Sequence, residues 1–305
     1  MKKQVPRILL LVDKKNWAFD ICAREYSKYL SDEFSFTIKY VAEKPMLLPF
    51  LFDLIHVFWW GESYYRRFLW PKRKVIKEVS SHRWEDDVRY GPCTTDEMTK
   101  KYLYDATTVF CTSKLLHSKI SPFFPNTYLV DNGYNPQKFK RLKPRTGDTL
   151  TLCWVGNDKD MVKGINDILL PAAGNEYAID IATNIKHEDL CAFYNEHDLF
   201  LIGSKHEASP LPLIEAMACG CFPVCTNVGI VSDLVYHKKN GYIVENRTIE
   251  DFRKAFLWCR ENIRFVREAG WQNSRIIYEK RRWEICAESF RKAYRGALLS
   301  AGIRE

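Results

Sequence analysis

The 305-residue sequence has no apolar stretch long enough to cross a membrane. Its basic start, Met1–Arg7, is followed only by the short apolar run Ile8–Val12, whereas a membrane-spanning helix needs about 20 apolar residues. The most apolar later stretch, Pro45–His56, is interrupted by Pro49 and Asp53. These absences argue against a signal peptide or a spanning helix, and we expect a cytoplasmic protein.

The sequence also has no CxxC pair, although it contains ten cysteines. Several of them, such as Cys111, Cys153 and Cys225, stand inside apolar runs. This pattern is typical of buried, reduced thiols in a cytoplasmic protein rather than of a disulfide framework or a zinc site.

The composition is neither that of a disordered chain nor that of an acidic protein. Hydrophobic residues make up 46% of the chain and charged residues 28%, which is a globular composition, and the length allows two domains. The net charge of +8 favours an anionic partner, for which a nucleotide, a phospholipid surface and a nucleic acid are the candidates. No known nucleic-acid motif accompanies the charge, so nucleic-acid binding is the least favoured of the three.

Short apolar runs with the length of buried strands alternate with helical patterns. The first series comprises Pro6–Val12, Phe36–Val41, Asp53–Trp60, Lys74–Val79, Thr107–Cys111 and Tyr128–Val130. After a basic linker at 138–148, the second series comprises Leu150–Val155, Ala178–Ala182, Asp198–Ile202 and Phe222–Cys225. The alternation predicts an α/β protein with doubly wound parallel sheets.

Polar residues mark several helix starts. Asn16 is expected to cap one helix, Thr94-Thr-Asp-Glu97 has the spacing of a capping box, and Thr248 is a third capping position. The last segment, Trp283–Leu299, repeats apolar residues at helical spacing and predicts a terminal helix.

The stretch 198–226 holds the strongest functional signal. An apolar strand is followed by a polar loop with Glu207, a short helix with Glu215, a glycine at position 220 that suits a left-handed helix end, and a second strand. Ligands of open parallel sheets bind at the carboxyl ends of the strands, and a helix start there favours a phosphate. Ser209, Pro210 and Leu211 form that helix start.

Glu207-x7-Glu215, followed by Ala-Met-Ala-Cys-Gly and Phe-Pro-Val-Cys-Thr-Asn-Val-Gly, resembles the signature of family 4 glycosyltransferases. The resemblance implies the GT-B fold, with two Rossmann-like domains whose parallel sheets face each other across a cleft. It also implies a retaining transfer from a nucleotide sugar, in which Glu207 contacts the sugar and Glu215 binds the ribose diol. The domains are then expected at 1–146 for the acceptor and 147–282 for the donor, with a terminal helix at 283–305 that returns to the first domain.

The segment Cys153–Gly164 resembles the stretch that opens the second domain of this family. There an arginine follows the glycine and a lysine comes six positions later. Gly156 and Lys163 fit this pattern, and Lys163 would neutralise the donor diphosphate. Asn157 stands at the arginine position and brings no charge. Asp158 and Asp160 in the same loop could suggest a metal, but the resemblance implies none, and we expect no metal and no cofactor.

One histidine is a candidate for a role near the reacting groups. His82 follows the predicted strand Lys74–Val79, where the resemblance implies contact with the donor sugar or a place beside the reaction centre. The other interpretation is an ordinary structural histidine. His56, inside an apolar strand, is expected in the core.

The stretch Glu62–Lys74 interleaves aromatic and basic residues. It could meet an anionic membrane surface at the inner face of the membrane, or a lipid-linked acceptor. The alternative is a helix with a solvated basic face.

Taken together, the motifs predict a metal-independent glycosyltransferase acting on a nucleotide sugar and a glycan or lipid-linked acceptor. No residue suggests an enzymic nucleophile, so the resemblance implies front-face substitution in which the leaving phosphate assists. Two alternatives remain: an inactive nucleotide-sugar-binding subunit, favoured by Asn157, and a basic nucleic-acid-binding protein. The donor base, the sugar and the acceptor are left open.

Overall fold

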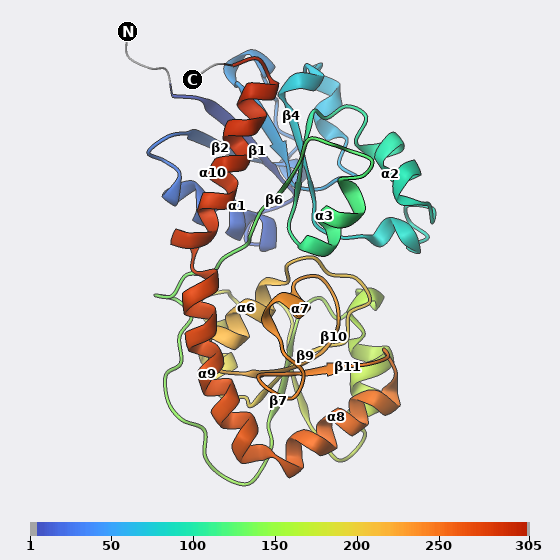
Figure 1. The fold of residues 1–305 in the computed structure, drawn as a ribbon, viewed down its shortest axis with the longest axis vertical. Helices are drawn as coiled ribbons and strands as arrows, with labels where there is room; N and C mark the ends of the chain where they lie inside the picture. The colour runs from blue at the N-terminus through green and yellow to red at the C-terminus, as the bar shows by residue number, and fades with distance from the viewer. Residues whose placement is uncertain (1–4, 304–305) are drawn as a thin grey trace. The chain divides into compact units, whose positions relative to one another are not determined.

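The computed structural model describes residues 5–303, which divide into two compact units (Figure 1). The first consists of residues 5–133 and 283–303, and the second is Tyr134–Arg282. Residues 1–4 of the first expected domain and 304–305 of the expected terminal helix lie outside the described residues.

The basic segment before position 146 lies with the second unit, although the sequence placed the boundary after residue 146. Two arginines explain the difference. Arg145 donates hydrogen bonds to the carbonyl oxygens of Tyr194 (2.9 Å) and Gly220 (2.8 Å), and Arg141 donates to that of Cys219 (3.3 Å). The predicted linker is therefore fixed onto the second unit by its own positive charges.

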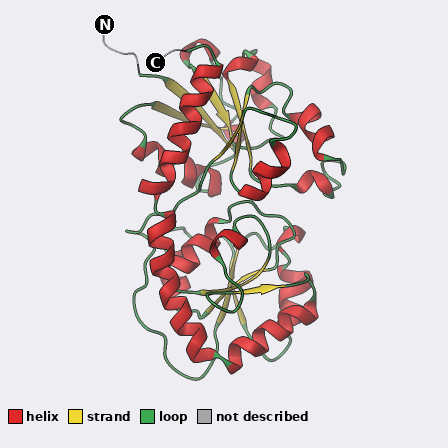
Figure 2. Cartoon of the chain, viewed as in Figure 1, coloured by secondary structure: helices red, strands yellow, loops and turns green. Residues whose placement is uncertain are grey.

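The first unit contains a six-stranded parallel sheet in the order β2-β1-β3-β4-β5-β6. The strands are β1 (Arg7–Val12), β2 (Ser35–Tyr40), β3 (Leu54–Val57), β4 (Val75–Val79), β5 (Thr108–Cys111) and β6 (Thr127–Leu129). The helices are α1 (Ala18–Tyr29), α2 (Thr95–Tyr102), α3 (Lys114–Ile120) and the terminal α10 (Trp283–Ser300). Between α1 and α2 lie the short 3-10 turns η1 (Val41–Glu43), η2 (Pro49–Leu51), η3 (Tyr64–Phe68), η4 (Lys72–Lys74) and η5 (Arg83–Glu85). Figure 2 shows the helices outside the strands.

The second unit contains a five-stranded parallel sheet in the order β11-β10-β9-β7-β8. The strands are β7 (Leu152–Val155), β8 (Ile179–Ala182), β9 (Leu199–Ile202), β10 (Phe222–Thr226) and β11 (Tyr242–Val244). The helices are α4 (Leu170–Ala173), α5 (Leu190–Asn195), α6 (Leu211–Ala218), α7 (Val231–Leu234), α8 (Ile249–Glu261) and α9 (Ile263–Arg281), and the turns η6 (Met161–Lys163) and η7 (Ile165–Leu169) follow β7. Separate apolar clusters are built around Leu213 and Ile214 of α6 and around Phe252 and Phe256 of α8.

Both sheets reverse their strand order once, between β1 and β3 in the first unit and between β7 and β9 in the second. At such a switch point the loops after neighbouring strands leave in opposite directions and open a crevice at the carboxyl ends. The loops after β7 and β9 are those that carry the two family motifs, so the strand order of the second unit brings them together.

The local predictions mostly hold. The two α/β parallel sheets are confirmed, as are the capping box at Thr94 and the cap at Thr248, whose side chain accepts from the Asp251 amide. Gly220 has a φ of 83°, as its left-handed position after α6 requires. The cap at Asn16 is wrong: Trp17 is the N-cap of α1, and the Asn16 amide donates to the Asp20 carboxylate instead. Strand β11 was not predicted.

Within residues 5–303, no helix has both the length and the apolar character that a membrane crossing requires. The terminal helix α10 is amphipathic, and its buried face is formed by residues of the predicted pattern, among them Trp283, Cys286, Phe290 and Ala293. Tyr294 of α10 lies near Tyr26 of α1 with the two hydroxyls 3.0 Å apart. The helix therefore belongs to the core of the first unit.

Candidate functional site

The loops at the carboxyl edge of the second sheet are held together by backbone hydrogen bonds. The Lys205 amide donates to the Val162 carbonyl (2.9 Å), which joins the loop after β9 to the loop after β7. The Ile230 amide donates to the Ala208 carbonyl (2.8 Å), which adds the loop after β10. Gly164 has a φ of 73°, and a β-carbon there would collide with the Gly203 carbonyl oxygen, so only glycine allows this approach. The edge is thus a connected set of loops and not separate turns.

Lys163 and Glu207 form an ion pair across the switch point. Lys163 Nζ donates to Glu207 Oε1 at 2.5 Å, and the Ser204 hydroxyl donates to the same oxygen at 2.9 Å. Thr226 in turn donates to the Ser204 carbonyl at 2.7 Å. The lysine side chain is 27% exposed and the glutamate side chain 14% exposed. Two predicted site residues that are 44 positions apart therefore meet, and a ligand can reach them from solvent.

Arg247, for which no role was predicted, supplies a further cation beside this pair. Its Nε donates to the Gly203 carbonyl at 2.7 Å and its Nη2 to the Asp167 carboxylate at 3.1 Å. Arg247 follows β11 by three positions, as Lys163 and Glu207 follow their own strands. A search for charged residues after every strand would have found it, but β11 itself was not predicted.

Glu215 lies on α6 and is 4% exposed. Its Oε1 is 2.6 Å from Nε2 of His187, which comes from the segment between β8 and α5. The His187 ring meets Phe139 edge-on at 5.0 Å between centroids, which fixes its orientation. A buried carboxylate needs a partner to offset its desolvation, and His187 provides one. No role was predicted for His187, although it too follows the end of a strand.

The helix start at Ser209, Pro210 and Leu211 holds an unpaired polar group. Pro210 is the N-cap of α6 and has no side-chain donor or acceptor for capping. The Ser209 hydroxyl oxygen is buried, and no protein group among the described residues hydrogen-bonds to it. Buried hydroxyls are almost always paired, so this one indicates a place where a water or a ligand oxygen binds.

The loop after β7 places the remaining predicted residues of this unit. The Gly156 amide donates to the Ala182 carbonyl of β8 at 3.2 Å. Asn157 is exposed, and its side-chain oxygen accepts from the Lys159 amide at 3.2 Å. Asp160 is the N-cap of η6, where it accepts from the Val162 amide at 3.3 Å. One of the two aspartates is thus already used in ordering the loop.

His82 lies in the first unit, after β4, where it is the N-cap of η5 (Arg83–Glu85) and 7% exposed. Its ring lies edge-on to Trp84, with centroids 6.4 Å apart. The other predicted site residues, Gly156, Asn157, Lys163, Glu207, Ser209, Pro210, Leu211 and Glu215, all belong to the second unit.

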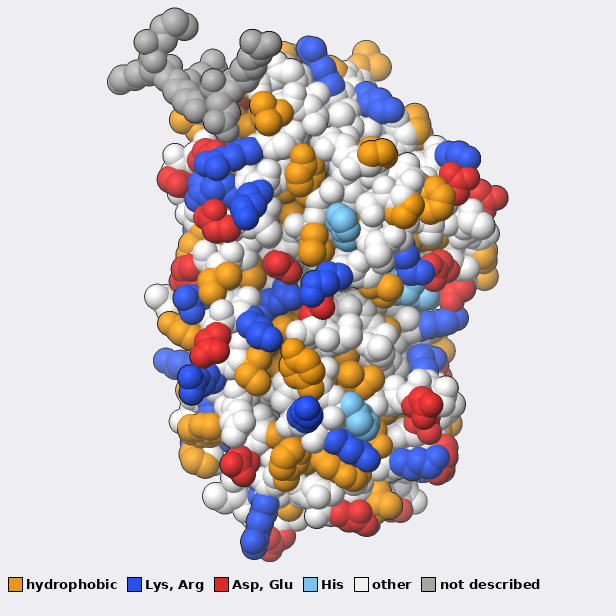
Figure 3. Space-filling view, viewed as in Figure 1, with side chains coloured by type: hydrophobic (Ala, Val, Ile, Leu, Met, Phe, Trp, Pro, Cys, Tyr) orange, Lys and Arg blue, Asp and Glu red, His pale blue; other side chains and the backbone are white. Residues whose placement is uncertain are grey.

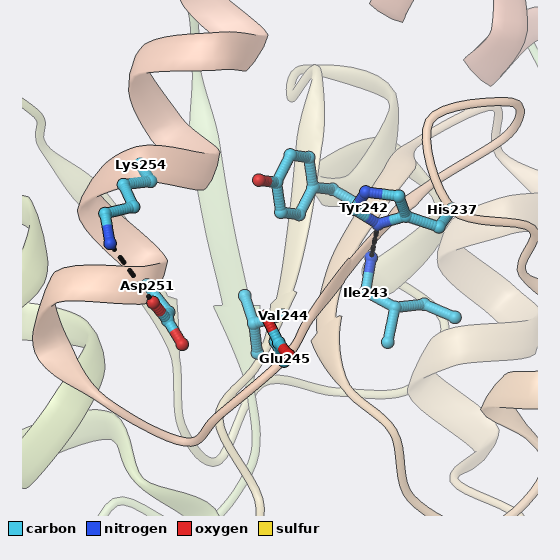
Figure 4. A pocket seen from close by; sticks show the side chains of 7 residues that line it. All are labelled: His237, Tyr242, Ile243, Val244, Glu245, Asp251 and Lys254. Carbon is cyan, nitrogen blue, oxygen red and sulfur yellow. Dashed lines mark hydrogen bonds and ion pairs between the residues drawn. The ribbon is translucent and has the colours of Figure 1, made fainter.

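The second unit also has two open pockets away from these residues. One, of about 440 Å³, is lined by residues of β11 and α8 together with His237 (Figure 4). There the Ile243 amide donates to His237 Nδ1 at 3.2 Å, and Lys254 lies 3.6 Å from Asp251. The other, of about 630 Å³, lies between α4 and α8. None of the predicted site residues lines either pocket.

The aromatic and basic stretch Glu62–Lys74 of the first unit is only partly buried. Tyr65 is buried and Arg66 donates to Asp105 at 2.6 Å, whereas Leu69 is 88% exposed. Before the stretch, Trp60 is buried, and Met46 and Phe50 are 74% and 73% exposed. On the face drawn in Figure 3, basic and acidic side chains are interspersed.

Residues 137–267 match the family model for Glycosyl transferases group 1, and they therefore form a domain of this group. The chain is 23% identical over 116 residues to an uncharacterized glycosyltransferase of Methanocaldococcus jannaschii, covering 38% of this chain and 33% of that protein. It is 29% identical over 107 residues to a probable sucrose-phosphate synthase of Thermosipho melanesiensis, covering 34% of this chain and 24% of that protein. The matched region spans about a third or less of the length of these relatives.

Solved structures resemble the chain over nearly its whole length. Sucrose-phosphate synthase from Thermosynechococcus elongatus has a TM-score of 0.73 at 15% identity, covering 97% of this chain and 100% of that chain. Anabaena HepE in complex with UDP and glucose has a TM-score of 0.70 at 12% identity, covering 95% of this chain and 99% of that chain. These similarities confirm the predicted fold class, two Rossmann-like domains with parallel sheets as in GT-B proteins.

Proposed function

We propose that this chain is a retaining glycosyltransferase of family 4, which transfers a sugar from a nucleoside diphosphate sugar to an acceptor hydroxyl in glycan or glycolipid biosynthesis. The observation that carries the proposal is the Lys163–Glu207 pair, which lies at the switch point where sheets of this kind bind ligands. The group 1 match covers both residues, and the UDP in the HepE structure supports a nucleotide as the ligand.

The ion pair suggests how the donor enters. Without a ligand, the charge of Lys163 is balanced by Glu207. A donor diphosphate brings competing anionic oxygens, so it draws Lys163 Nζ toward itself and releases the Glu207 carboxylate. Glu207 is then available to accept hydrogen bonds from the sugar hydroxyls of the same donor. One rearrangement therefore serves both the phosphates and the sugar.

The remaining donor contacts follow from the same edge of the sheet. Glu215, oriented by His187, accepts from the ribose diol. The unpaired Ser209 hydroxyl and the start of α6 bind a phosphate oxygen, and Gly156 and Asn157 border the diphosphate. Arg247 lies at the same edge but is paired with Asp167, so it compensates for the uncharged Asn157 only if a ligand draws it away from that carboxylate.

The chemistry assigned to the chain is positioning and charge neutralisation. Lys163 stabilises the leaving diphosphate, whose oxygen assists removal of the acceptor proton, and the new bond forms on the face that the phosphate leaves. The first unit is assigned to a glycan or lipid-linked acceptor, with His82 beside the reaction centre. No metal and no cofactor takes part. We place the protein in the cytoplasm, with weak contact to anionic lipid through the exposed side chains near Phe50.

A second function is favoured by one observation. Asn157 is exposed and uncharged where the family has an arginine, so the chain would bind the diphosphate less strongly. An inactive subunit that binds nucleotide sugars without turning them over is the corresponding alternative.

A donor screen separates these functions. UDP, ADP and GDP sugars are added in turn, and we expect one of them to raise the melting temperature and to be converted slowly to free nucleoside diphosphate. Conversion should persist in EDTA and be lost in Glu207→Ala. Binding without conversion identifies the inactive subunit, and rescue of an EDTA-treated enzyme by manganese or magnesium contradicts the metal-free mechanism. If no nucleotide sugar binds, the proposal fails.

A further inference from the structure

Two thiols of the second unit lie close enough to react with each other. Cys191 in α5 and Cys219, the C-cap of α6, have their sulfur atoms 3.9 Å apart although they are 28 positions apart in the sequence. Both are free cysteines. Cys191 is half-buried and open to small reagents, whereas Cys219 is buried behind it. The pair therefore has one accessible sulfur and one protected sulfur.

The surroundings make Cys191 the more reactive thiol. Its sulfur accepts hydrogen bonds from the Cys219 thiol and from the Asn195 side-chain amide at 3.6 Å. The hydrogen bond from Cys219 lowers the pKa of Cys191 to about 6, and Lys140 adds to the effect. The same bond, together with burial, raises the pKa of Cys219, which keeps its proton. A thiolate with a protonated neighbour is the arrangement of an attacking and a resolving cysteine.

We propose that Cys191 and Cys219 form a reactive dithiol that is oxidised to an intramolecular disulfide by a small disulfide such as glutathione disulfide. The Cys191 thiolate attacks one sulfur of the oxidant, forms a mixed disulfide and expels one glutathione thiolate. Cys219 then loses its proton, attacks the Cys191 sulfur and expels the second glutathione. Two protein thiols are oxidised by two electrons, and the oxidant is reduced to two thiols.

The disulfide would lie beside the contact that holds Glu215. His187 and Cys191 are four positions apart on one segment, and Glu215 and Cys219 are four positions apart on the other. The two segments are therefore in contact at two points, which have the same spacing along each segment. Drawing the sulfurs to about 2 Å brings the segments closer and shifts His187 relative to Glu215. Only this step rests on the proposed function. If that function is correct, oxidation changes the affinity of the protein for the nucleoside diphosphate.

Other thiols provide matched controls. Cys153 and Cys225 are fully buried in strands of the same unit, and burial raises their pKa values. They should remain reduced in the folded protein, because neither the thiolate nor a path to the oxidant is available.

The test is to treat the folded, full-length protein with glutathione disulfide and to map its thiols by mass spectrometry. We expect the wild type to lose about 2 Da and to yield one cross-linked peptide pair containing Cys191 and Cys219. Cys219→Ala should stop at a glutathione adduct on Cys191, Cys191→Ser should not react, and Cys225→Ser should behave as the wild type. Melting curves of the reduced variants confirm that each is folded.

Absence of the cross-link in the wild type, or an adduct on another cysteine in Cys219→Ala, overturns the proposal. UDP and ADP affinities are measured before and after oxidation in the same samples. A cross-link in a protein that binds neither nucleotide supports the dithiol and counts against the proposed function, so the two failures are distinguishable.

Discussion

The two units share a sheet architecture but use their polar residues differently. In the first unit, His56 of β3 and Tyr294 of α10 are hydrogen-bonded at 2.7 Å, Tyr26 lies 3.0 Å from Tyr294, and Glu78 lies 3.4 Å from the other side of the imidazole. All four side chains are buried, and burial raises the pKa of Glu78. This network faces inward and joins the terminal helix to the sheet.

In the second unit the corresponding charges lie at the edge of the sheet. Lys163, Glu207 and Arg247 come from loops after three different strands, and the Lys163 side chain is 27% exposed. The comparison shows two uses of polar groups on the same kind of sheet. The inward network of the first unit joins a helix to the sheet, whereas the Lys163–Glu207 pair of the second unit lies at the sheet edge and can be reached from solvent.

The largest expected effect is on transfer by Glu207→Gln. The amide keeps the shape of the side chain but loses the charge, so it holds the donor sugar more weakly in the transition state, and we expect a decrease of about 100-fold in kcat. Affinity for the bare nucleoside diphosphate should be retained. Glu188→Gln, a change at an exposed glutamate of the same unit, is the control. Equal loss of nucleotide affinity and transfer would contradict the division of roles.

Glu215→Gln should weaken binding of the nucleoside diphosphate itself. The ribose diol loses a charged acceptor, which corresponds to about 1.5–3 kcal/mol, or roughly a tenfold or greater rise in Kd. His187→Ala should have a smaller effect in the same direction, because it leaves the carboxylate in place but less well oriented. Calorimetric titration with UDP and ADP measures both, and an unchanged Kd in Glu215→Gln would exclude its place at the ribose.

Tyr294→Phe tests the inward network of the first unit. The change removes the hydroxyl that His56 and Tyr26 share and leaves them only their own contact at 3.5 Å. This loss should lower the free energy of unfolding by about 1–3 kcal/mol. Nucleotide binding should not change, since the four residues belong to the first unit. Denaturant unfolding measures the change in stability, and titration of the same sample with UDP or ADP measures nucleotide affinity. A change in nucleotide affinity at constant stability would mean that the network has more than a packing role.

The smallest expected effect concerns anionic vesicles. Met46, Phe50 and Leu69 are exposed, and Lys72 and Arg73 are exposed basic residues of the same unit, each of which adds about 1 kcal/mol of attraction to an anionic surface. We expect weak co-sedimentation at low salt that is lost in Phe50→Ser/Leu69→Ser and kept in Val88→Ser, a control at another exposed apolar residue. No binding of the wild type at low salt would leave a protein that acts away from lipid.

Local sequence patterns were sufficient to predict much of the fold. The apolar runs predicted the strands because a buried parallel strand is apolar on both faces, and Thr94, Thr248 and Gly220 marked helix ends through local hydrogen bonds and backbone conformation. Strand β11 was not predicted, although β6, which is just as short, was. The burial of Trp60 and Tyr65 depends on packing within the first unit, which an aromatic and basic pattern does not reveal.

The candidate site could be predicted residue by residue but not as an arrangement. Lys163 and Glu207 were each expected near a donor, yet their ion pair depends on β9 lying beside β7 while β8 lies outside it. That strand order is set by tertiary packing, so a local sequence pattern does not reveal it. His187 was missed for the same reason, since its partner Glu215 is 28 positions away on helix α6.

The most direct test is a double-mutant cycle at Lys163 and Glu207, read by calorimetric titration with UDP and ADP. Lys163→Ala leaves the Glu207 carboxylate unbalanced and should raise Kd by roughly 10- to 150-fold, the equivalent of about 1.5–3 kcal/mol. Glu207→Gln frees Lys163 and should leave Kd unchanged or lower it, and Lys163→Ala/Glu207→Gln should recover part of the loss because the repulsion is removed. The account predicts this coupling, whereas an unchanged Kd in Lys163→Ala would contradict it.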